Sequence, residues 1–240
     1  MIELLGVGVP RDGGGWLVRG ICARIRPGEL TAVVSRDRHE GQAIFDAITG
    51  RSIPVEGRIW VDGVPLMRET AGRVRRRVGE ARLDARLSEG RSLFWNALAA
   101  PRESARLVHG LLRYPQPWER SAVRRALGLV ALEARAWDRV ETLDTSARGS
   151  FALARALAVA PSYIVLSCLE RGDAGEAVRM LTLARRLAES ERIGIVVGLP
   201  DLELAHGRAH HVLGLAGGSL VFEGPPAATP REPEVPARLA

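Results

Sequence analysis

Residues 28–50 contain the segment that most restricts the fold of this chain. The sequence there reads GELTAVVSRDRHEGQAIFDAITG. An apolar, β-rich run from Leu30 to Val34 is followed by a short polar loop, and then by a helix-like stretch from about Gly41 to Thr49 that Gly50 closes. A buried strand that leads through a short loop into a helix is typical of α/β proteins with a largely parallel sheet.

The pattern along the rest of the chain agrees with that fold class. The first 25 residues suggest two short strands around the glycine-rich turn at 12–15, and Asp62-Gly63 is a strong hairpin signal. Strand and helix patterns later alternate over Tyr163–Leu166, Gly175–Ala188, Ile193–Val197, Val212–Leu215 and Leu220–Phe222. The sequence therefore predicts an α/β sheet domain over residues 1–225, a helical subdomain inserted at about 84–160, and a proline-rich tail at 226–240.

The charge of the chain does not favour nucleic-acid binding. The net charge is +6, and all 34 basic residues are arginine, against 28 acidic residues. The densest basic patch contains Arg73, Arg75, Arg76 and Arg77, and no aromatic side chains are interleaved with it. Nucleic-acid sites usually combine such patches with aromatic stacking. We therefore predict a solvated face that precedes a strand.

The apolar segments and the cysteines give information on membrane contact and on the cellular compartment of the chain. The longest apolar stretch, residues 156–169, is interrupted by Pro161 and is shorter than a membrane-spanning helix. The sequence therefore predicts contact with a membrane only through a partner. Cys22 and Cys168 lie in apolar, β-like surroundings, and we expect both to be buried free thiols.

The loop within residues 28–50 has the layout of a phosphate-binding loop without its residues. Such a loop has the pattern G-x-x-x-x-G-K-[ST], whose backbone N–H groups and lysine surround the phosphates. The four specified positions hold Ser35, Glu40, Gly41 and Gln42. A lysine–phosphate attraction at about 4 Å is worth roughly 4 kcal/mol at an effective dielectric constant near 20. Because that attraction is lost and Asp37 and Glu40 add carboxylates, we predict that the loop repels a triphosphate.

Two arginines in this loop offer an alternative. Arg36 and Arg38 could donate to phosphate, but an arginine fork needs more room than the lysine for which a loop of this length is built. The candidate cofactor-binding segment is therefore a degenerate phosphate loop without tight binding: Ser35, Arg36, Asp37, Arg38, His39, Glu40, Gly41, Gln42 and Ala43.

Four segments carry a resemblance to a known family. They are GELTAVVS before the loop, VEGRIWVDG at the hairpin, LARALAVAPSYIVLS, which is the most specific, and AHHVLGLAGGSLVFEGPP near the end. Through their order and spacing, residues 2–228 resemble the nucleotide-binding subunit of an ATP-binding-cassette (ABC) transporter, in particular the phosphonate-import type. The resemblance implies a P-loop NTPase-like ABC ATPase fold, with a mixed sheet core, an antiparallel β part and an inserted helical subdomain.

The resemblance also implies how such a subunit works. Two copies would meet head to tail, with ATP and Mg²⁺ between the phosphate loop of one copy and the signature loop of the other. Their closure would drive a membrane permease. The implied partners are an ABC permease, an intact ABC ATPase paralogue or a second copy of this chain. The implied location is cytoplasmic, at the inner face of the cell membrane.

The catalytic positions implied by the resemblance hold residues that lack the required chemistry. The Mg²⁺-binding aspartate and the catalytic glutamate correspond to Ser167 and Cys168, so no carboxylate ligand or base is present. The switch histidine corresponds to Pro200, which has no donor and no titratable group. The glutamine that contacts Mg²⁺ corresponds to about Leu83. Glu170 could act as a substitute base, but an acid at a helix N-terminus is the commoner explanation for such a residue.

The signature motif L-S-G-G-Q of the family corresponds to residues 143–147, LDTSA. The glycines that allow the backbone to approach phosphate are absent, and an aspartate adds negative charge. The same residues are well suited to cap the helix predicted over Ser146–Val159. This degenerate signature loop comprises Asp144, Thr145, Ser146 and Ala147.

These residues predict a non-catalytic ABC-type subunit, a pseudo-ATPase that pairs with a permease or an intact ATPase paralogue in a phosphonate-type import system. ATP and Mg²⁺ follow from the family resemblance alone, and no metal site is expected. Two alternatives stay open. One is an active, ATP-hydrolysing import subunit with substituted site residues, and the other is a soluble interaction module that no longer takes part in transport.

Overall fold

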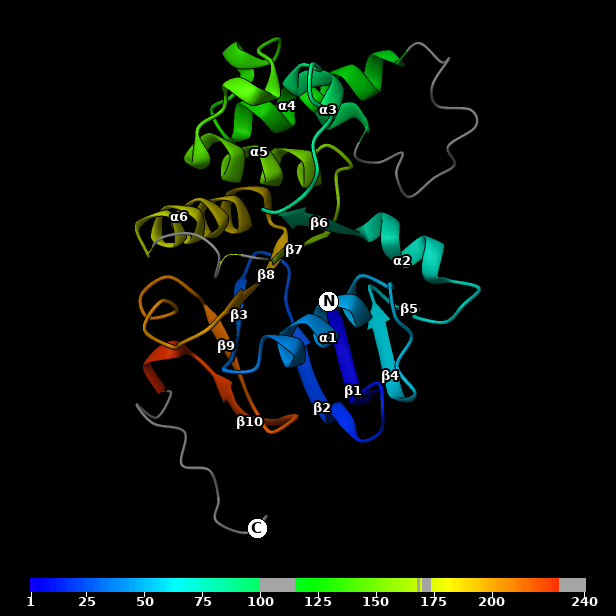
Figure 1. The fold of residues 1–240 in the computed structure, drawn as a ribbon. Helices are drawn as coiled ribbons and strands as arrows, with labels where there is room; N and C mark the ends of the chain where they lie inside the picture. Colours follow the sequence, from blue (N-terminus) through cyan, green and yellow to red (C-terminus); the bar gives the residue numbers. More distant parts are fainter. Residues whose placement is uncertain (100–114, 168, 170–173, 229–240) are drawn as a thin grey trace.

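The computed structural model describes residues 1–99, 115–167, 169 and 174–228; residues 100–114, 168, 170–173 and 229–240 lie outside that description (Figure 1). The described chain has two β-sheets, with one helix between them and a group of helices over the far face of the larger sheet. Among these residues, no helix is both long and apolar enough to cross a lipid bilayer.

The smaller sheet is antiparallel, with the strand order β2-β1-β4-β5. Both of its hairpins are those that the sequence predicts. In the second hairpin, Asp62 and Gly63 have φ angles of 47° and 73°, and a two-residue hairpin turn of this kind favours an Asp-Gly pair. The strands are β1 (Ile2–Pro10), β2 (Trp16–Ile25), β4 (Glu56–Val61) and β5 (Val64–Pro65).

The larger sheet is mixed, with the strand order β10-β9-β3-β8-β7-β6. All neighbouring strands in it run parallel except β10, which is antiparallel to β9. The predicted α/β class with a mixed sheet and an antiparallel part is thus confirmed. The strands are β3 (Leu30–Ser35), β6 (Val78–Arg82), β7 (Tyr163–Ser167), β8 (Gly194–Leu199), β9 (His211–Ala216) and β10 (Ser219–Gly224).

The central strands of the larger sheet are buried on both faces, because their side chains alternate between two apolar cores. In β7, Ile164 and Leu166 belong to the core under the helices, whereas Tyr163 and Val165 belong to the core shared with the smaller sheet. Burial on both faces explains why these strands read as continuous apolar runs rather than as alternating ones.

The helices occupy both faces of the larger sheet. Helix α1 (Arg38–Ile48) lies between the two sheets, against β2 on one side and β3 and β8 on the other (Figure 1). On the opposite face are α3 (Leu93–Ala99), α4 (Pro117–Leu129), α5 (Thr145–Leu157) and α6 (Ala174–Glu191). The limits of the helical subdomain at 84–160 and of the tail at 226 stay predictions.

The arginine run contains a helix that the sequence did not indicate. Residues Ala71–Arg77 form α2, directly before β6. Arg75 donates from Nε and Nη2 to the carbonyl oxygen of Gly50, at 3.2 and 2.8 Å, and so satisfies an acceptor just beyond the end of α1. Part of this basic patch is therefore structural.

The expected burial of the cysteines is wrong for Cys22. Its side chain is exposed on β2, although the flanking Ile21 and Ala23 are buried. The alternation of a strand with one covered face explains the difference, since Cys22 is at the position whose side chain faces away from the core. Cys168 lies outside the described residues.

Candidate functional site

Three of the predicted site positions meet at one edge of the larger sheet. Strands β3, β8 and β7 are parallel neighbours, so their carboxyl ends lie side by side. β3 ends at Ser35, β7 ends at Ser167, and Pro200 directly follows β8. In α/β proteins the carboxyl edge of a parallel sheet is the usual place for a ligand. This carboxyl edge is the candidate site.

Helix α1 begins at this edge, and its first backbone donors already have partners. Asp37 is the N-cap, with φ −92° and ψ 105°, and its Oδ1 accepts a hydrogen bond from the N–H of His39 at 2.9 Å. The N–H of Glu40 donates to the carbonyl oxygen of Asp37 at 3.0 Å. The N–H of Asp37 donates to Oγ of Ser35 at 3.1 Å. The amides of residues 37, 39 and 40 are thus occupied within the chain.

The loop between β3 and α1 is consequently short, since only Arg36 and Asp37 separate the two elements. The sequence predicted a helix from about Gly41, whereas α1 begins at Arg38. The difference has a local cause, because aspartate is among the best N-cap residues and places the helix start directly after itself. The side chains of Arg36 and Arg38 are exposed.

Glu40 points into the protein, and its side chain is only 5% exposed. Its Oε2 lies 2.5 Å from Oγ of Ser35, which donates to it, and its Oε1 accepts from the N–H of Gly218 at 2.6 Å. Gly218 lies in the turn between β9 and β10. The position at which a phosphate loop has a glycine therefore holds a buried carboxylate with two donors of its own.

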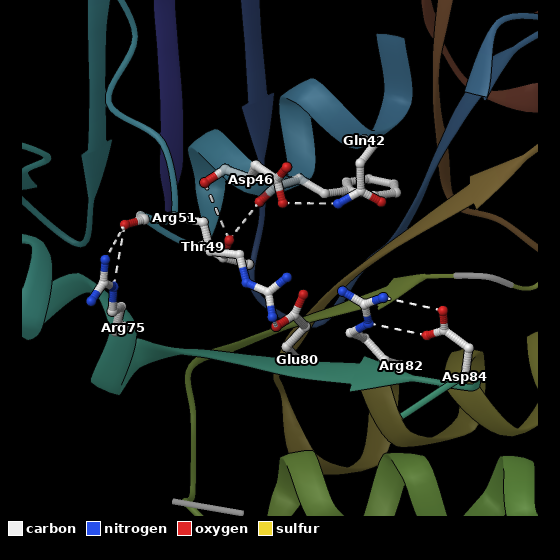
Figure 2. Close-up of polar contacts among 10 residues, drawn as sticks. Gln42, Asp46, Thr49, Arg51, Arg75, Glu80, Arg82 and Asp84 are labelled. Atoms are coloured by element: carbon white, nitrogen blue, oxygen red, sulfur yellow. Dashed lines mark hydrogen bonds and ion pairs between the residues drawn. The ribbon is translucent and has the colours of Figure 1, made fainter. Parts of the chain in front are cut away.

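The next polar residue of α1 is also engaged within the helix. Gln42, at the position of the metal-binding hydroxyl, donates from Nε2 to Oδ1 of Asp46 at 2.8 Å (Figure 2). The two residues are four apart, the spacing at which side chains meet on a helix surface. Near the end of α1, Oγ1 of Thr49 donates to the carbonyl oxygen of Phe45 at 2.8 Å.

Two ion pairs each include one residue of the edge strand β6, Glu80 or Arg82 (Figure 2). Nη2 of Arg51 is 2.5 Å from Oε2 of Glu80. Arg82 donates to both carboxylate oxygens of Asp84, at 3.0 and 3.1 Å. This group was not predicted from the sequence. The Arg-x-Asp spacing at 82–84 was the only local signal, and nothing in the sequence indicated the partner of Glu80.

Glu80 is the titratable group most affected by this arrangement. Burial raises its pKa above the ordinary value of 4.5, and the nearby Arg51 and Arg82 oppose that rise without cancelling it. Asp46 and Asp84 add a smaller increase in the same direction. The charges of the two arginines are thus shared among several carboxylates.

The predicted signature loop forms the start of α5. Asp144 is the N-cap, with φ −70° and ψ 174°, and its Oδ1 accepts from the N–H of Ala147 at 2.7 Å. This confirms the capping interpretation of that segment. Thr145 and Ser146 are the first residues of the helix. The segment precedes a helix and does not follow a strand of the carboxyl edge.

The positions of the implied metal ligand and base are only partly described. Ser167 is buried, and its carbonyl oxygen accepts from the N–H of Leu83 at 3.4 Å, which places Leu83 beside it. Pro200 is exposed. Cys168 and the alternative base Glu170 lie outside the described residues. Within the described ranges, no three His, Cys, Asp or Glu side chains are grouped in a way that could hold a metal ion.

Comparison with known sequences finds import ATP-binding proteins among the relatives of this chain. No family model matches the chain. It is 25% identical over 211 residues to the phosphonates import ATP-binding protein PhnC of Thiobacillus denitrificans, covering 88% of this chain and 82% of that protein. It is 26% identical over 229 residues to PhnC 2 of Halalkalibacterium halodurans, covering 90% and 88%. It is 26% identical over 208 residues to the methionine import ATP-binding protein MetN of Cutibacterium acnes, covering 85% of this chain and 55% of that protein.

Solved structures agree on the fold. CbiO1 from Clostridium perfringens, described as part of the ABC transporter complex CbiONQ, matches with a TM-score of 0.81 at 19% identity, covering 94% of this chain and 88% of that chain. The ATP-binding cassette MJ0796, solved as a dimer with ADP and phosphate, matches with a TM-score of 0.72 at 18% identity, covering 94% and 98%. The predicted resemblance is thereby confirmed: this chain has the fold of ABC ATPase cassettes, and its sequence is similar to those of phosphonate-import ATP-binding proteins.

Proposed function

We propose that this chain is a non-catalytic ABC subunit, which pairs with a permease or with an intact ATPase paralogue in a phosphonate-type import system. The names of the relatives support the transport role, because several are phosphonates import ATP-binding proteins. A cytoplasmic position at the inner face of the membrane follows from that role. The absence of catalysis rests on the geometry of the carboxyl edge.

The observation that carries the proposal is the start of α1 at Arg38. A phosphate loop binds through free backbone N–H groups and the positive end of the following helix. Here Asp37 caps the helix and occupies the N–H of His39, while the amides of residues 37 and 40 donate to Ser35 and Asp37. A phosphate at this place would have to displace a side chain that is already negatively charged.

The remaining residues do not fit Mg²⁺ and ATP either. Mg²⁺ prefers carboxylate and hydroxyl oxygens, but Ser167 stands where the aspartate belongs, and the Gln42 amide is bonded to Asp46. No lysine exists anywhere in the sequence to neutralise the phosphates. In the second loop, the carboxylate of Asp144 occupies the N–H of Ala147 at the start of α5. Both halves of a composite nucleotide site are therefore unsuitable.

Affinity capture from membranes of the native host tests the proposed partners. The tagged full-length chain should co-purify with a polytopic membrane protein or with an ABC subunit that has a complete G-x-x-x-x-G-K-[ST] loop, each identified by mass spectrometry. Recovery of the chain alone or only with unrelated soluble proteins would favour the interaction module instead.

ATPase assays on the captured complex test the alternative that this chain itself hydrolyses ATP. If the partner is an intact ATPase, replacing the lysine of the partner's phosphate loop should abolish ATP turnover. The double variant Arg36→Ala and Arg38→Ala in this chain should leave ATP turnover unchanged. Loss of turnover on changing the two arginines would support an active site built from substituted residues.

A further inference from the structure

Glu40 connects the segment between β3 and α1 to a turn that is far away in the sequence. Its carboxylate accepts from Ser35 at the end of β3 and from the N–H of Gly218, 178 residues away in the sequence. The carbonyl oxygen of Gly218 in turn accepts from the N–H of Arg19 in β2, at 2.8 Å. A continuous chain of hydrogen bonds therefore runs from the loop before α1, through the β9–β10 turn, to the smaller sheet.

The β9–β10 turn is built so that Gly218 can make this contact. Gly218 has a φ of +78°, and a Cβ atom placed on it would lie 2.9 Å from the carbonyl oxygen of Leu17. Any other L-residue would be strained there and would push the turn away from β2. The turn is thus held close enough to β2 for the N–H of Gly218 itself to point at Glu40.

Glu40 is buried, so its hydrogen bonds are not incidental contacts at the protein surface. The side chain is 5% exposed, and both of its oxygens have donors at 2.6 Å or less. A buried carboxylate persists only when donors satisfy it, because the loss of such a partner costs more than a neutral hydrogen bond contributes.

We propose that Glu40 is an internal latch that fastens the β3–α1 loop to the β9–β10 turn and so fixes one conformation of the loop with no phosphate bound. With these two hydrogen bonds in place, the loop holds its conformation without nucleotide. This role of Glu40 belongs to the isolated chain and does not depend on the partner proposed above.

Amide hydrogen exchange at Gly218, measured by NMR on the full-length chain, tests the latch. In Glu40→Ala the N–H of Gly218 loses its acceptor, and its exchange should become roughly ten- to a hundredfold faster. Glu40→Gln can still accept from Gly218 through its carbonyl oxygen and donate to Ser35, so its exchange should stay within about threefold of the wild type. Glu40→Asp keeps the charge but is one methylene too short, and should behave like the alanine variant.

The exchange of Ile164 in β7 is the internal reference, because it reports unfolding of the whole core. Glu69→Ala, at an exposed glutamate, is the matched control and should change neither amide. Unchanged exchange at Gly218 in both the Ala and Asp variants would overturn the proposal. Equal acceleration at Gly218 and Ile164 in the alanine variant, together with a destabilised Gln variant, would also overturn it, since Glu40 would then act on overall stability and not on the loop.

Discussion

The interior of the larger sheet and its carboxyl edge use their residues in different ways. In the interior, β7 and β8 have the continuous apolar runs of a parallel sheet buried on both faces. At the edge, the amides of residues 37, 39 and 40 and the carboxylates of Asp37 and Glu40 are bonded within the chain. The fold therefore depends on apolar packing, while the three amides at the edge already have acceptors within the chain.

This difference indicates that, in an ABC cassette, the sheet fold and the binding of a polyanion at its edge can be separated. Apolar packing of the strands specifies the sheet whether or not a ligand binds at its end. Binding of a polyanion needs unoccupied N–H groups and positive charge at the same edge. Since the two requirements involve different residues, a chain can keep the first and lose the second. Variants of each region should accordingly have effects of different size.

The largest expected effect is in the sheet interior. Ile164→Ala removes a fully buried side chain from β7 and should lower the free energy of unfolding by roughly 2–5 kcal/mol, because it leaves a cavity between the sheet and the helices. Arg36→Ala, at an exposed position of the edge, should change it by no more than about 0.5 kcal/mol. Urea denaturation of both variants gives the comparison. Equal losses would mean that the edge also holds the fold together.

An intermediate effect is expected at the two aspartate caps. Asp37→Ala and Asp144→Ala should each cost about 1 kcal/mol of unfolding free energy, since each removes the acceptor for a helix N–H. Asparagine is an equally good cap, so Asp37→Asn and Asp144→Asn should recover most of the loss. Chemical denaturation measures all four variants. If asparagine fails to rescue either site, the carboxylate acts through its charge and not as a cap.

The smallest expected effect is in the ion pairs that include residues of β6. Because the pKa of Glu80 is raised above 4.5 in the folded state, its contribution to stability is fully present below that value and declines as the pH rises through the folded pKa. Glu80→Gln should remove this decline, with a difference below roughly 1 kcal/mol because Arg51 and solvent offset part of it. Unfolding free energies of both proteins from pH 4 to pH 7 provide the test. A wild type that gains stability relative to the variant over that range would contradict the direction of the shift.

Much of the fold could be predicted from the sequence, because periodicity reports which side chains face a core. The runs at Leu30–Val34 and Tyr163–Leu166 are strands within a residue or two of their predicted ends. The Asp62-Gly63 hairpin follows from the positive φ angles that this pair accepts. The helix α2 was missed because its seven residues contain four arginines and only a short apolar signal.

The arrangement of the carboxyl edge was less predictable. Sequence patterns identified the segment 35–43 and the absence of its cation, but not the partners of its polar groups. Glu40 finds its donor 178 residues away, and Arg51 finds Glu80 at a separation of 29. Such pairings depend on how the two sheets and α1 come together, which no local pattern encodes. The sequence therefore predicted added negative charge at Glu40, whereas the structure shows a buried and satisfied carboxylate.

Isothermal titration of the purified full-length chain with Mg²⁺ and ATP tests the central claim most directly. With the amides of residues 37, 39 and 40 occupied and no lysine in the chain, we expect no saturable heat of binding up to millimolar nucleotide. Saturable binding with a sub-millimolar Kd would show that the carboxyl edge still holds a triphosphate, and would contradict the account.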